Sequence, residues 1–390
     1  MKFSFLCSSK CFFSSSAIND EEAFRGVQIL QNVNAFSYNE LKSATNGFRS
    51  SNKIGEGGFG SVYKGRLQDG RIVAVKVLSA DSKQGDKEFM TEIASLSNIS
   101  HENLVKLHGG CVDGPFRILV YEYMKNNNLS RLMLGLLGWE ARRKICLGIA
   151  RGLVYIHEEV QPHIVHRDIK ASNIVLDENF NPKISDFGLS KLFPDNISHI
   201  TTKVAGTLGY LSPEYAISGR LTRKSDVYSF GVLLLEIVSG RSAVDFDLQL
   251  GEHYLVEKAW EMYKSDKLID LVDSNITNTI YSANFSSDLD GEEEKDHQDQ
   301  EEDQEEEEEE EAVHFLKVGL LCVQENSRLR PTMSMAIRMM KNDIKIDDVQ
   351  ITGPGLINNI MDVKIGKRPT SMQVGTSCMQ SPQSNNYHFR

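Results

Sequence analysis

Polar and apolar positions alternate through the first part of the chain that carries a regular pattern, which starts near Lys53. An Asp-Gly pair at positions 69 and 70 separates two of the alternating runs and favours a tight β-hairpin between them. Alternation of this kind is typical of strands with one buried face. We expect five strands in an antiparallel sheet, including runs at 60–65, 71–78, 104–107 and 117–121.

Helical spacing interrupts these strands once and dominates the chain after them. Phe89, Ile93 and Leu96 recur three or four positions apart, as on one face of a helix. Later stripes of the same spacing predict helices at 139–157 and 225–239, a stripe at 313–323, and a last helix that starts at Pro331. A small β-rich lobe of residues 54–122 should therefore precede a larger helical lobe of residues 125–341, an α+β architecture.

Three segments lack a pattern that could fold alone. Residues 1–36 are rich in serine and aperiodic, residues 282–311 have low complexity and high charge, and the tail 342–390 is irregular. We expect the first two segments to be disordered. Residues 37–53 predict a lead-in helix that ends at Gly47 and packs outside the core.

The net charge of −11 belongs to one of these segments. Residues 288–311 hold 17 Asp and Glu against Lys295, a net charge of −16 that leaves +5 for the remaining chain. The global acidity therefore argues neither for nor against anionic partners of the folded part. The glutamate run itself is either an inert solvated loop or an attraction for basic partners.

The cysteines and the N-terminus bear on location. Six scattered cysteines without a Cys-x-x-Cys pair fit a reducing compartment and give no structural zinc site. No apolar run approaches the roughly 20 residues that span a bilayer, and the first apolar patch is too short for a signal peptide. We expect a cytoplasmic protein in which Cys7 and Cys11 are either acylated, for peripheral contact with the plasma membrane, or part of an unmodified tail.

A glycine-rich segment is the first sign of chemistry. Gly55, Gly57 and Gly60 remove side chains where a backbone must close over phosphates. The pattern alone is weak evidence, because it also occurs in dinucleotide-binding loops. Such loops open a helix, whereas a predicted strand follows Gly60, so the context excludes dinucleotide binding.

Lys76 ends the fragment Val-Ala-Val-Lys, where a lysine can grip the α and β phosphates of ATP. Its partner should be an acid on the predicted helix that follows. Glu92 and Glu88 both lie on that helix, and we favour Glu92 because Glu88 is too close to the helix start.

Two later fragments supply the remaining parts of a phosphoryl-transfer site. Asp168 in His-Arg-Asp can orient an attacking hydroxyl, and Lys170 can neutralise charge beside it. Asn173 and Asp186, the latter in Asp-Phe-Gly, offer the hard oxygen ligands that magnesium prefers. Because four fragments in this order supply different parts of one site, chance is a poor explanation for them.

Taken together, these fragments resemble the eukaryotic protein kinase superfamily, and within it the plant receptor-like kinases related to Pelle and the interleukin-receptor-associated kinases. The most specific phrases begin at Ile54, Leu119, His166 and Asp226. The resemblance covers about 54–341 and is strongest to cytoplasmic members without an ectodomain. It implies a bilobal protein kinase fold that transfers the γ-phosphoryl group of ATP with Mg²⁺, or alternatively Mn²⁺.

The resemblance also implies roles that spacing alone does not give. It implies an adenine site with Tyr121 as gatekeeper, Glu122 and Met124 as hinge, and apolar walls from Ile54, Val62, Ala74 and Val175. Lys170 in Asp-Ile-Lys-Ala-Ser-Asn is similar to serine/threonine kinases, so we expect Ser or Thr as the acceptor. The implied partners are a protein substrate and a receptor kinase or co-receptor, with no nucleic acid.

Control of activity is implied by Arg167, which directly precedes Asp168. A phosphate on the activation segment, residues 186–214, would pair with the guanidinium of Arg167 and order the segment. The candidate phosphorylation sites are Ser198, Thr201 and Thr202. The resemblance implies that Thr207 contacts the catalytic loop. It also implies scaffold roles for Asp226 and for an Arg330–Glu214 pair.

Two departures keep a second function open. Relatives usually carry a longer loop at 134–139, and the acidic insertion is foreign to them. If either impairs the fold, the chain is a pseudokinase scaffold that binds without turnover. Lys76, Asp168 and Asp186 are all present, which favours an enzyme, and a metabolic kinase would not need so long an activation segment.

Overall fold

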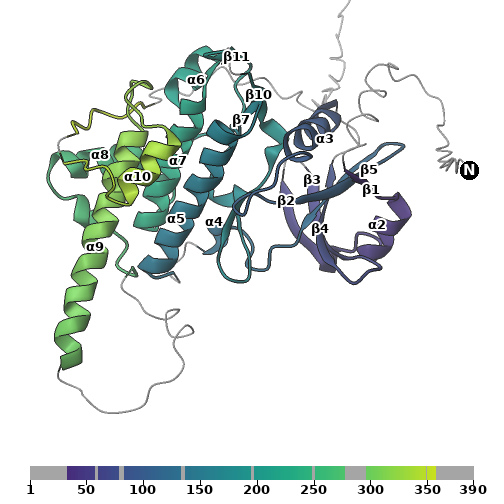
Figure 1. Ribbon diagram of the computed structural model, residues 1–390, viewed down its shortest axis with the longest axis horizontal. Coiled ribbons are helices and arrows are strands. Elements are labelled where there is room, and N and C mark those ends of the chain that lie inside the picture. The colour runs from purple at the N-terminus through teal and green to yellow at the C-terminus, as the bar shows by residue number, and fades with distance from the viewer. Residues whose placement is uncertain are drawn as a thin grey trace, which may run out of the picture.

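The computed structural model describes residues 33–57, 60–78, 83–132, 137–194, 197–247, 251–276, 296–347 and 349–356. The chain forms a small lobe built on a sheet and a larger, mainly helical lobe (Figure 1). This confirms the predicted bilobal α+β architecture. The predictions for residues 1–32, which include Cys7 and Cys11, and for residues 357–390 lie outside the described part.

The small lobe holds a six-stranded sheet in the order β1-β5-β6-β4-β3-β2. Five strands pair antiparallel, as predicted: β2 Lys53–Gly57, β3 Gly60–Arg66, β4 Ile72–Leu78, β5 Leu107–Asp113 and β6 Phe116–Glu122. The strand predicted at 104–107 is wrong, because β5 starts only at Leu107 and Leu104 makes a single bridge to Ile184. A sixth strand, β1 Asn34–Ala35, pairs parallel with β5. This strand lies within residues 1–36, so the prediction of disorder is wrong for its two residues.

Two helices cover the sheet. Helix α3 Lys83–Leu96 buries Phe89, Ile93 and Leu96, the predicted apolar stripe. Helix α2 Tyr38–Ala44 starts after the cap Ser37 and ends three residues before Gly47, the predicted helix end. A 3-10 turn at Ser50–Asn52 follows it. The expectation that α2 packs outside the core is wrong, because Leu41 is fully buried in a cluster with Val73 and Val75 of β4.

The large lobe is organised around helix α7 Arg223–Ser239, whose residues from Ser225 onward are all buried. It packs against α5 Trp139–Val154 and the long helix α9 Asp296–Cys322. The remaining helices are α4 Leu129–Leu132, α6 Pro213–Ser218, α8 Leu255–Lys264 and α10 Met333–Met340, with a π turn at Tyr155–Glu159 after α5 and short 3-10 turns at Ala171–Asn173, Phe187–Leu189 and Leu268–Leu271.

Short strand pairs hold the loops of this lobe. They are β7 His163–Val165 with β10 Lys191–Phe193, β8 Ile174–Leu176 with β9 Pro182–Ile184, β11 Ile200–Thr201 with β12 Arg220–Leu221, and β13 Val244–Asp247 with β14 Gly251–Tyr254. The first two pairs frame the segment between His163 and Phe193, which carries the candidate catalytic residues. No helix of the described residues is long and apolar enough to cross a membrane.

The acidic insertion is only partly described, and its described half is helical. Residues 296–311 form the first turns of α9, so the prediction of disorder is wrong for them, while 277–295 lie outside the described residues. Glutamate has a good helix propensity and favours a helix N-terminus. Glu311 also fixes the run to the lobe, because its carboxylate accepts 2.7 Å hydrogen bonds from Trp139 Nε1 and Arg143 Nε.

The C-terminal boundary differs slightly from the prediction. Helix α10 begins at Met333 behind the cap Thr332, so Pro331 precedes the helix and does not start it. The following residues are irregular, as predicted, yet they pack on the lobe through the buried Ile346 and Ile351. Of the segment 134–139, residues 134–136 lie outside the described part and Trp139 starts α5.

Candidate active site

The hairpin of β2 and β3 carries the three candidate phosphate-loop glycines. Gly57 pairs with Gly60 across the turn, and Gly60 has φ of +131°, a region that favours glycine. A Cβ atom on Gly60 would lie against the carbonyl oxygen of Val77, well inside contact distance. The backbone at Gly60 therefore passes next to β4 only because no side chain is present.

Lys76 lies at the centre of an ion-pair network. Its Nζ atom is 2.5 Å from Glu92 Oε1 and 2.7 Å from Asp186 Oδ1. Strand β4 provides the lysine, α3 provides Glu92, and the loop after β9 provides Asp186. The structure thus joins three predicted site residues from both lobes.

Two charges of this network, those of Lys76 and Asp186, stabilise each other. Burial alone would lower the pKa of Lys76, but the neighbouring Asp186 and Glu92 carboxylates outweigh it and raise the pKa of the ammonium group. Burial would likewise raise the pKa of Asp186, and Lys76 reverses that effect and lowers it. Lys76 is therefore a cation and Asp186 an anion at neutral pH.

The structure also decides between the two candidate acids on α3. Glu92 is fully buried and contacts Lys76, whereas Glu88 accepts a 2.7 Å hydrogen bond from Gln84 one turn away. The choice of Glu92 is confirmed in geometry. Sequence reasoning missed one contact here: the Tyr121 hydroxyl donates to the second carboxylate oxygen of Glu92 and fixes its rotamer.

Asp168 sits in a second network, on the loop between β7 and β8. Its Oδ1 accepts a 2.7 Å hydrogen bond from Thr207, and its Oδ2 lies 3.0 Å from both Lys170 Nζ and Asn173 Nδ2. Lys170 also donates to Thr207 Oγ1 at 2.7 Å. The carboxylate is 4% exposed and is held in one orientation by residues from the catalytic loop and the activation segment.

Asn173 and Asp186 meet the requirements of the predicted metal site in chemistry. The Asn173 amide nitrogen donates to the Asp168 carbonyl and carboxylate, and the amide oxygen accepts no hydrogen bond from any residue that the structure describes. Asp186 is held in a left-handed conformation, with φ of 66° and ψ of 68°, that is uncommon for residues other than glycine. The described residues contain no group of three His, Cys, Asp or Glu that could enclose a metal.

Asp226 on α7 binds the backbone of the loop between β7 and β8, the catalytic loop. Its carboxylate accepts the backbone N–H groups of His166 at 2.7 Å and Arg167 at 2.8 Å, and it lies 2.9 Å from His157 Nε2. Burial would raise the pKa of Asp226, but the hydrogen bond from His157 and nearby positive charge lower it. The predicted scaffold role therefore has a structural basis in a buried, charged acceptor.

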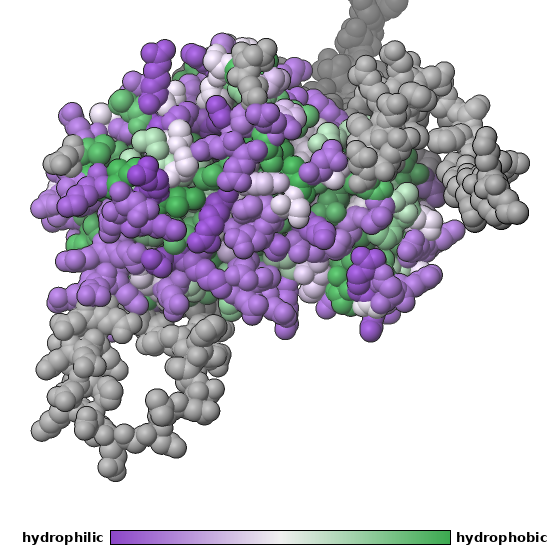
Figure 2. Space-filling view, viewed as in Figure 1, coloured by the Kyte–Doolittle hydropathy of each residue, from purple (hydrophilic) through white to green (hydrophobic). Residues whose placement is uncertain are grey.

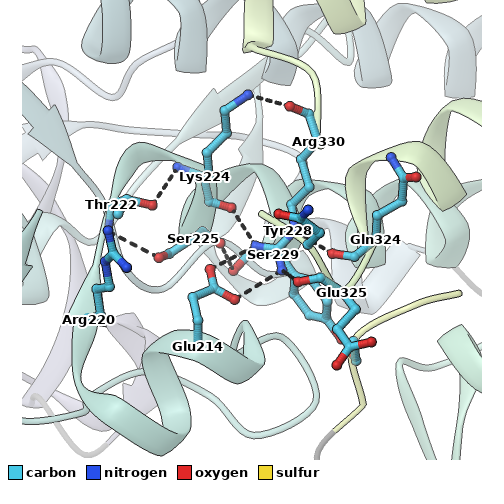
Figure 3. Close-up of polar contacts among 12 residues, drawn as sticks. Glu214, Arg220, Thr222, Lys224, Ser225, Tyr228, Ser229, Gln324, Glu325 and Arg330 are labelled. Atoms are coloured by element: carbon cyan, nitrogen blue, oxygen red, sulfur yellow. Dashed lines mark hydrogen bonds and ion pairs between the residues drawn. The ribbon is translucent and has the colours of Figure 1, made fainter. Parts of the chain in front are cut away.

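A second scaffold pair joins the end of the activation segment to the base of the large lobe. Arg330 is 1% exposed, and its two terminal nitrogens lie 2.8 and 3.0 Å from the two carboxylate oxygens of Glu214. Figure 3 shows the guanidinium between Glu214 and the backbone carbonyls of Lys224 and Gln324. The fork-shaped pairing fixes the start of α6 relative to the segment after α9.

The residues implied for adenine come from both lobes. Ile54, Val62, Ala74, Met124 and Val175 are all half-buried. Register places Ala74 next to the gatekeeper candidate Tyr121, and Val175 is bridged to Asn128. Glu122 turns its carboxylate to the Lys106 N–H at 2.8 Å and to Lys183 at 3.1 Å. The adenine contacts themselves remain predictions.

Arg167 contacts the activation segment directly. It has φ of 75°, and its guanidinium donates to the carbonyls of Leu189 at 2.9 Å and Lys203 at 2.8 Å. A further partner, which no motif indicates, is the hydroxyl of Tyr215, which accepts a hydrogen bond from Arg167 Nε at 3.0 Å. Among the regulatory candidates, Ser198 and Thr201 are exposed and Thr202 is half-buried.

Comparison with known proteins gives one consistent result. The protein kinase domain family matches residues 48–341. Cold-responsive protein kinase 1 of Arabidopsis thaliana is 50% identical over 347 residues, which are 87% of this chain and 82% of the relative. Two probable LRR receptor-like serine/threonine-protein kinases of the same plant are 46% and 47% identical, and the match spans 30% and 29% of their length. The chain belongs to the protein kinase family, within the group of plant receptor-like kinases related to Pelle.

Proposed function

We propose that this protein kinase transfers the γ-phosphoryl group of ATP to serine and threonine hydroxyls of proteins, with Asp168 as the residue that orients the acceptor. The observation that carries the proposal is a pair of contact networks. In one, Lys76 contacts Glu92 and Asp186. In the other, Asp168 contacts Lys170 and Asn173. The printed names of the relatives support the choice of Ser and Thr.

Each residue has a separate task in this mechanism. Lys76, held by Glu92, presents a fixed positive charge to the α and β phosphates. Asp168 accepts a hydrogen bond from the substrate hydroxyl and aims its oxygen at the γ-phosphorus. Lys170, 3.0 Å from Asp168 and also bonded to Thr207, offsets the negative charge that develops on the transferred group.

The chemistry of the donors fits a divalent cation bound together with the nucleotide. Mg²⁺ usually takes one or two protein ligands and completes its coordination shell with phosphates and water. The amide oxygen of Asn173 and the carboxylate of Asp186 fit this preference. When bound, the cation neutralises phosphate charge. We propose Mg²⁺ for this site, and activity assays with Mg²⁺ and Mn²⁺ compared at equal concentration would reveal a preference for Mn²⁺ instead.

The test is the substitution Asp168→Asn, which removes the acceptor for the hydroxyl proton and keeps the shape. We expect labelling of the kinase itself and of a basic protein substrate by Mg-ATP to fall roughly 10²–10⁴-fold. Asp113→Asn, on the exposed strand end of β5, makes the same chemical change away from the site and should leave labelling unchanged. Equal labelling by Asp168→Asn and the parent protein would overturn the assignment.

Three further proposals concern regulation and location. Phosphorylation of Ser198, Thr201 or Thr202 would place negative charge near Arg167, which already contacts the activation segment and has no ion pair with a carboxylate among the described residues. Mass spectrometry of residues 186–214 after incubation with ATP would identify the site.

Receptor-like relatives support a receptor kinase or co-receptor as partner. Acylation of Cys7 and Cys11 would give peripheral membrane contact, and unchanged membrane association after Cys→Ser replacement of both would exclude it.

A further inference from the structure

A groove of about 1180 Å³ opens on the large lobe, between the start of α5, the 3-10 turn Leu268–Leu271, helix α9 and the segment after α10. Its floor is apolar and comes from residues of the main core, namely Trp139, Leu268, Ile346 and Ile351. None of the catalytic or nucleotide-site residues described above lines it. The groove is therefore a separate feature of the surface.

Two large aliphatic side chains at the groove are exposed to solvent. Ile269 is 50% exposed and Val349 is 37% exposed, although neighbouring residues of both segments are buried. Burial of such side chains by a partner gains roughly 25 cal/mol per Å² of apolar surface. The groove thus offers an apolar contact that the described residues do not fill.

The rim of the groove is strongly acidic. Seven carboxylates line it against two cations, Arg143 and Lys317. Arg143 is already paired with Glu311, which leaves one lysine to offset the rest. Within the described part of the chain, five of the carboxylates form no ion pair: Glu140, Asp266, Glu307, Glu310 and Asp347. Figure 2 shows a largely hydrophilic surface at the lower left of the molecule, beside the position of α9 in Figure 1.

One wall of the groove is the acidic run itself. Glu307, Glu308, Glu310 and Glu311 line it, at a spacing that puts them on one face of α9. Glu305 and Glu306 lie on the same helix, are exposed, and do not line the groove. Because Glu311 is tied to Trp139 and Arg143, the wall is held against the lobe.

We propose that this groove is a docking site for a lysine- and arginine-rich segment of a protein substrate that also carries an aliphatic side chain. The charge of the rim matches the basic residues, and Ile269 and Val349 match the aliphatic one. The acidic insertion then works as one wall of a substrate-docking surface, outside the catalytic cleft. This inference rests on the proposed action on protein substrates, but its test does not require catalysis.

The primary test measures binding of a fluorescent peptide by anisotropy, in the absence of ATP. The peptide contains four lysines or arginines around two leucines. We expect binding that weakens steeply with salt, and about tenfold weaker binding by Glu307→Gln/Glu310→Gln, which corresponds to about 1.4 kcal/mol. The matched variant Glu305→Gln/Glu306→Gln removes the same charge from the same helix outside the groove and should bind as the parent protein does.

An independent variant tests the apolar side of the groove. Ile269→Ser should weaken binding of the same peptide, and a peptide with both leucines replaced by serine should bind the parent protein as weakly as the full peptide binds Ile269→Ser. Equal loss in the two glutamate variants, or binding that is indifferent to Ile269 and to the leucines, would overturn the proposal and leave only diffuse attraction to a charged helix.

A final arm links docking to phosphorylation and separates it from other occupants. An acceptor peptide joined to the basic segment through flexible linkers of increasing length should show about tenfold lower KM than the acceptor alone. The variant Glu307→Gln/Glu310→Gln should abolish this difference. All variants should phosphorylate the short acceptor equally. Peptide binding that appears only after removal of residues 357–390 would assign the groove to the chain's own tail and contradict the proposal.

Discussion

The catalytic cleft and the α9 groove use carboxylates in opposite ways. In the cleft, Glu92, Asp186 and Asp168 are each within 3.0 Å of a lysine of the same chain, and all three side chains are largely or fully removed from solvent. In the groove, acids such as Glu307 and Glu310 are exposed and have no cation among the described residues. Paired, buried carboxylates fix geometry, whereas unpaired, exposed ones leave their charge for a partner.

The difference has a consequence for experiments. A buried pair is costly to break, since removal of one member leaves a charge with neither water nor counterion. An exposed acid can be neutralised with little effect on the fold. Changes in the paired group should therefore affect stability or turnover, and changes in the groove should affect only association. Three substitutions test this contrast at buried groups.

Arg330→Met should have the largest effect on stability. It keeps most of the buried volume but leaves Glu214 without its two-pronged partner beneath the activation segment. We expect the free energy of unfolding to fall by about 3–5 kcal/mol, as for other broken buried pairs. Chemical denaturation of the parent and variant would measure this loss.

Arg328→Met provides the matched control for that experiment. Arg328 lies two residues away, is exposed, and forms no ion pair within the described residues. Its replacement should change stability by less than about 0.5 kcal/mol. Similar losses in both variants would show that pairing is not what distinguishes buried from exposed charges in this protein.

Glu92→Gln should have the next largest effect, and it acts on turnover. The substitution removes the charge that positions Lys76, while Asp186 still holds the lysine in the cleft. We expect kcat/KM to fall about 10²-fold, because a small misplacement of a catalytic group is enough for such a loss. Steady-state kinetics with the short acceptor peptide would measure it.

Glu88→Gln is the control on the same helix. Glu88 is buried but contacts Gln84 and not Lys76, and burial raises its pKa to about 7, so it carries only part of a charge near neutral pH. Its replacement should reduce kcat/KM by less than a factor of about three, because Glu88 does not position Lys76. An effect as large as that of Glu92→Gln would contradict the assignment of Glu92 as the partner of Lys76.

Motif residues were predictable because their chemistry is encoded in short fragments. Lys76, Asp168 and Asp186 were all predicted from the sequence, and the structure brings each to a named partner. The contact between Tyr215 and Arg167 was not predictable, because 48 positions separate them and a tyrosine in a helix carries no sign of its partner. Such long-range contacts depend on how α6 and the catalytic loop meet.

Two errors have a common physical cause. Strand β1 has only two residues, too few for a pattern of alternation, so it was assigned to a disordered segment. The glutamate run was assigned to a disordered loop because its composition cannot form a core. Its described half is nevertheless helical, because it is continuous with the buried apolar half of α9 and because Glu311 accepts hydrogen bonds from Trp139 and Arg143. Composition describes a segment in isolation, and here neighbouring elements decide.

Glu236→Gln should give the smallest effect. It tests a case between the two extremes, a buried carboxylate that pairs with no cation in the described part of the chain. Its oxygens accept from Tyr210 at 2.5 Å and from the Ala243 N–H at 2.7 Å, and burial raises its pKa to about 7. The raised pKa means that this group contributes most to stability below its unfolded pKa of 4.5 and that the contribution is lost as pH rises through about 7. Glutamine stays neutral, accepts from Ala243, and can donate to the Tyr210 hydroxyl. The parent protein should therefore lose about 1 kcal/mol more stability than the variant between pH 6 and pH 8, in denaturation curves recorded at both values. If the two proteins respond equally to pH, Glu236 is ionised throughout, and burial without a counterion does not neutralise an acid in this lobe.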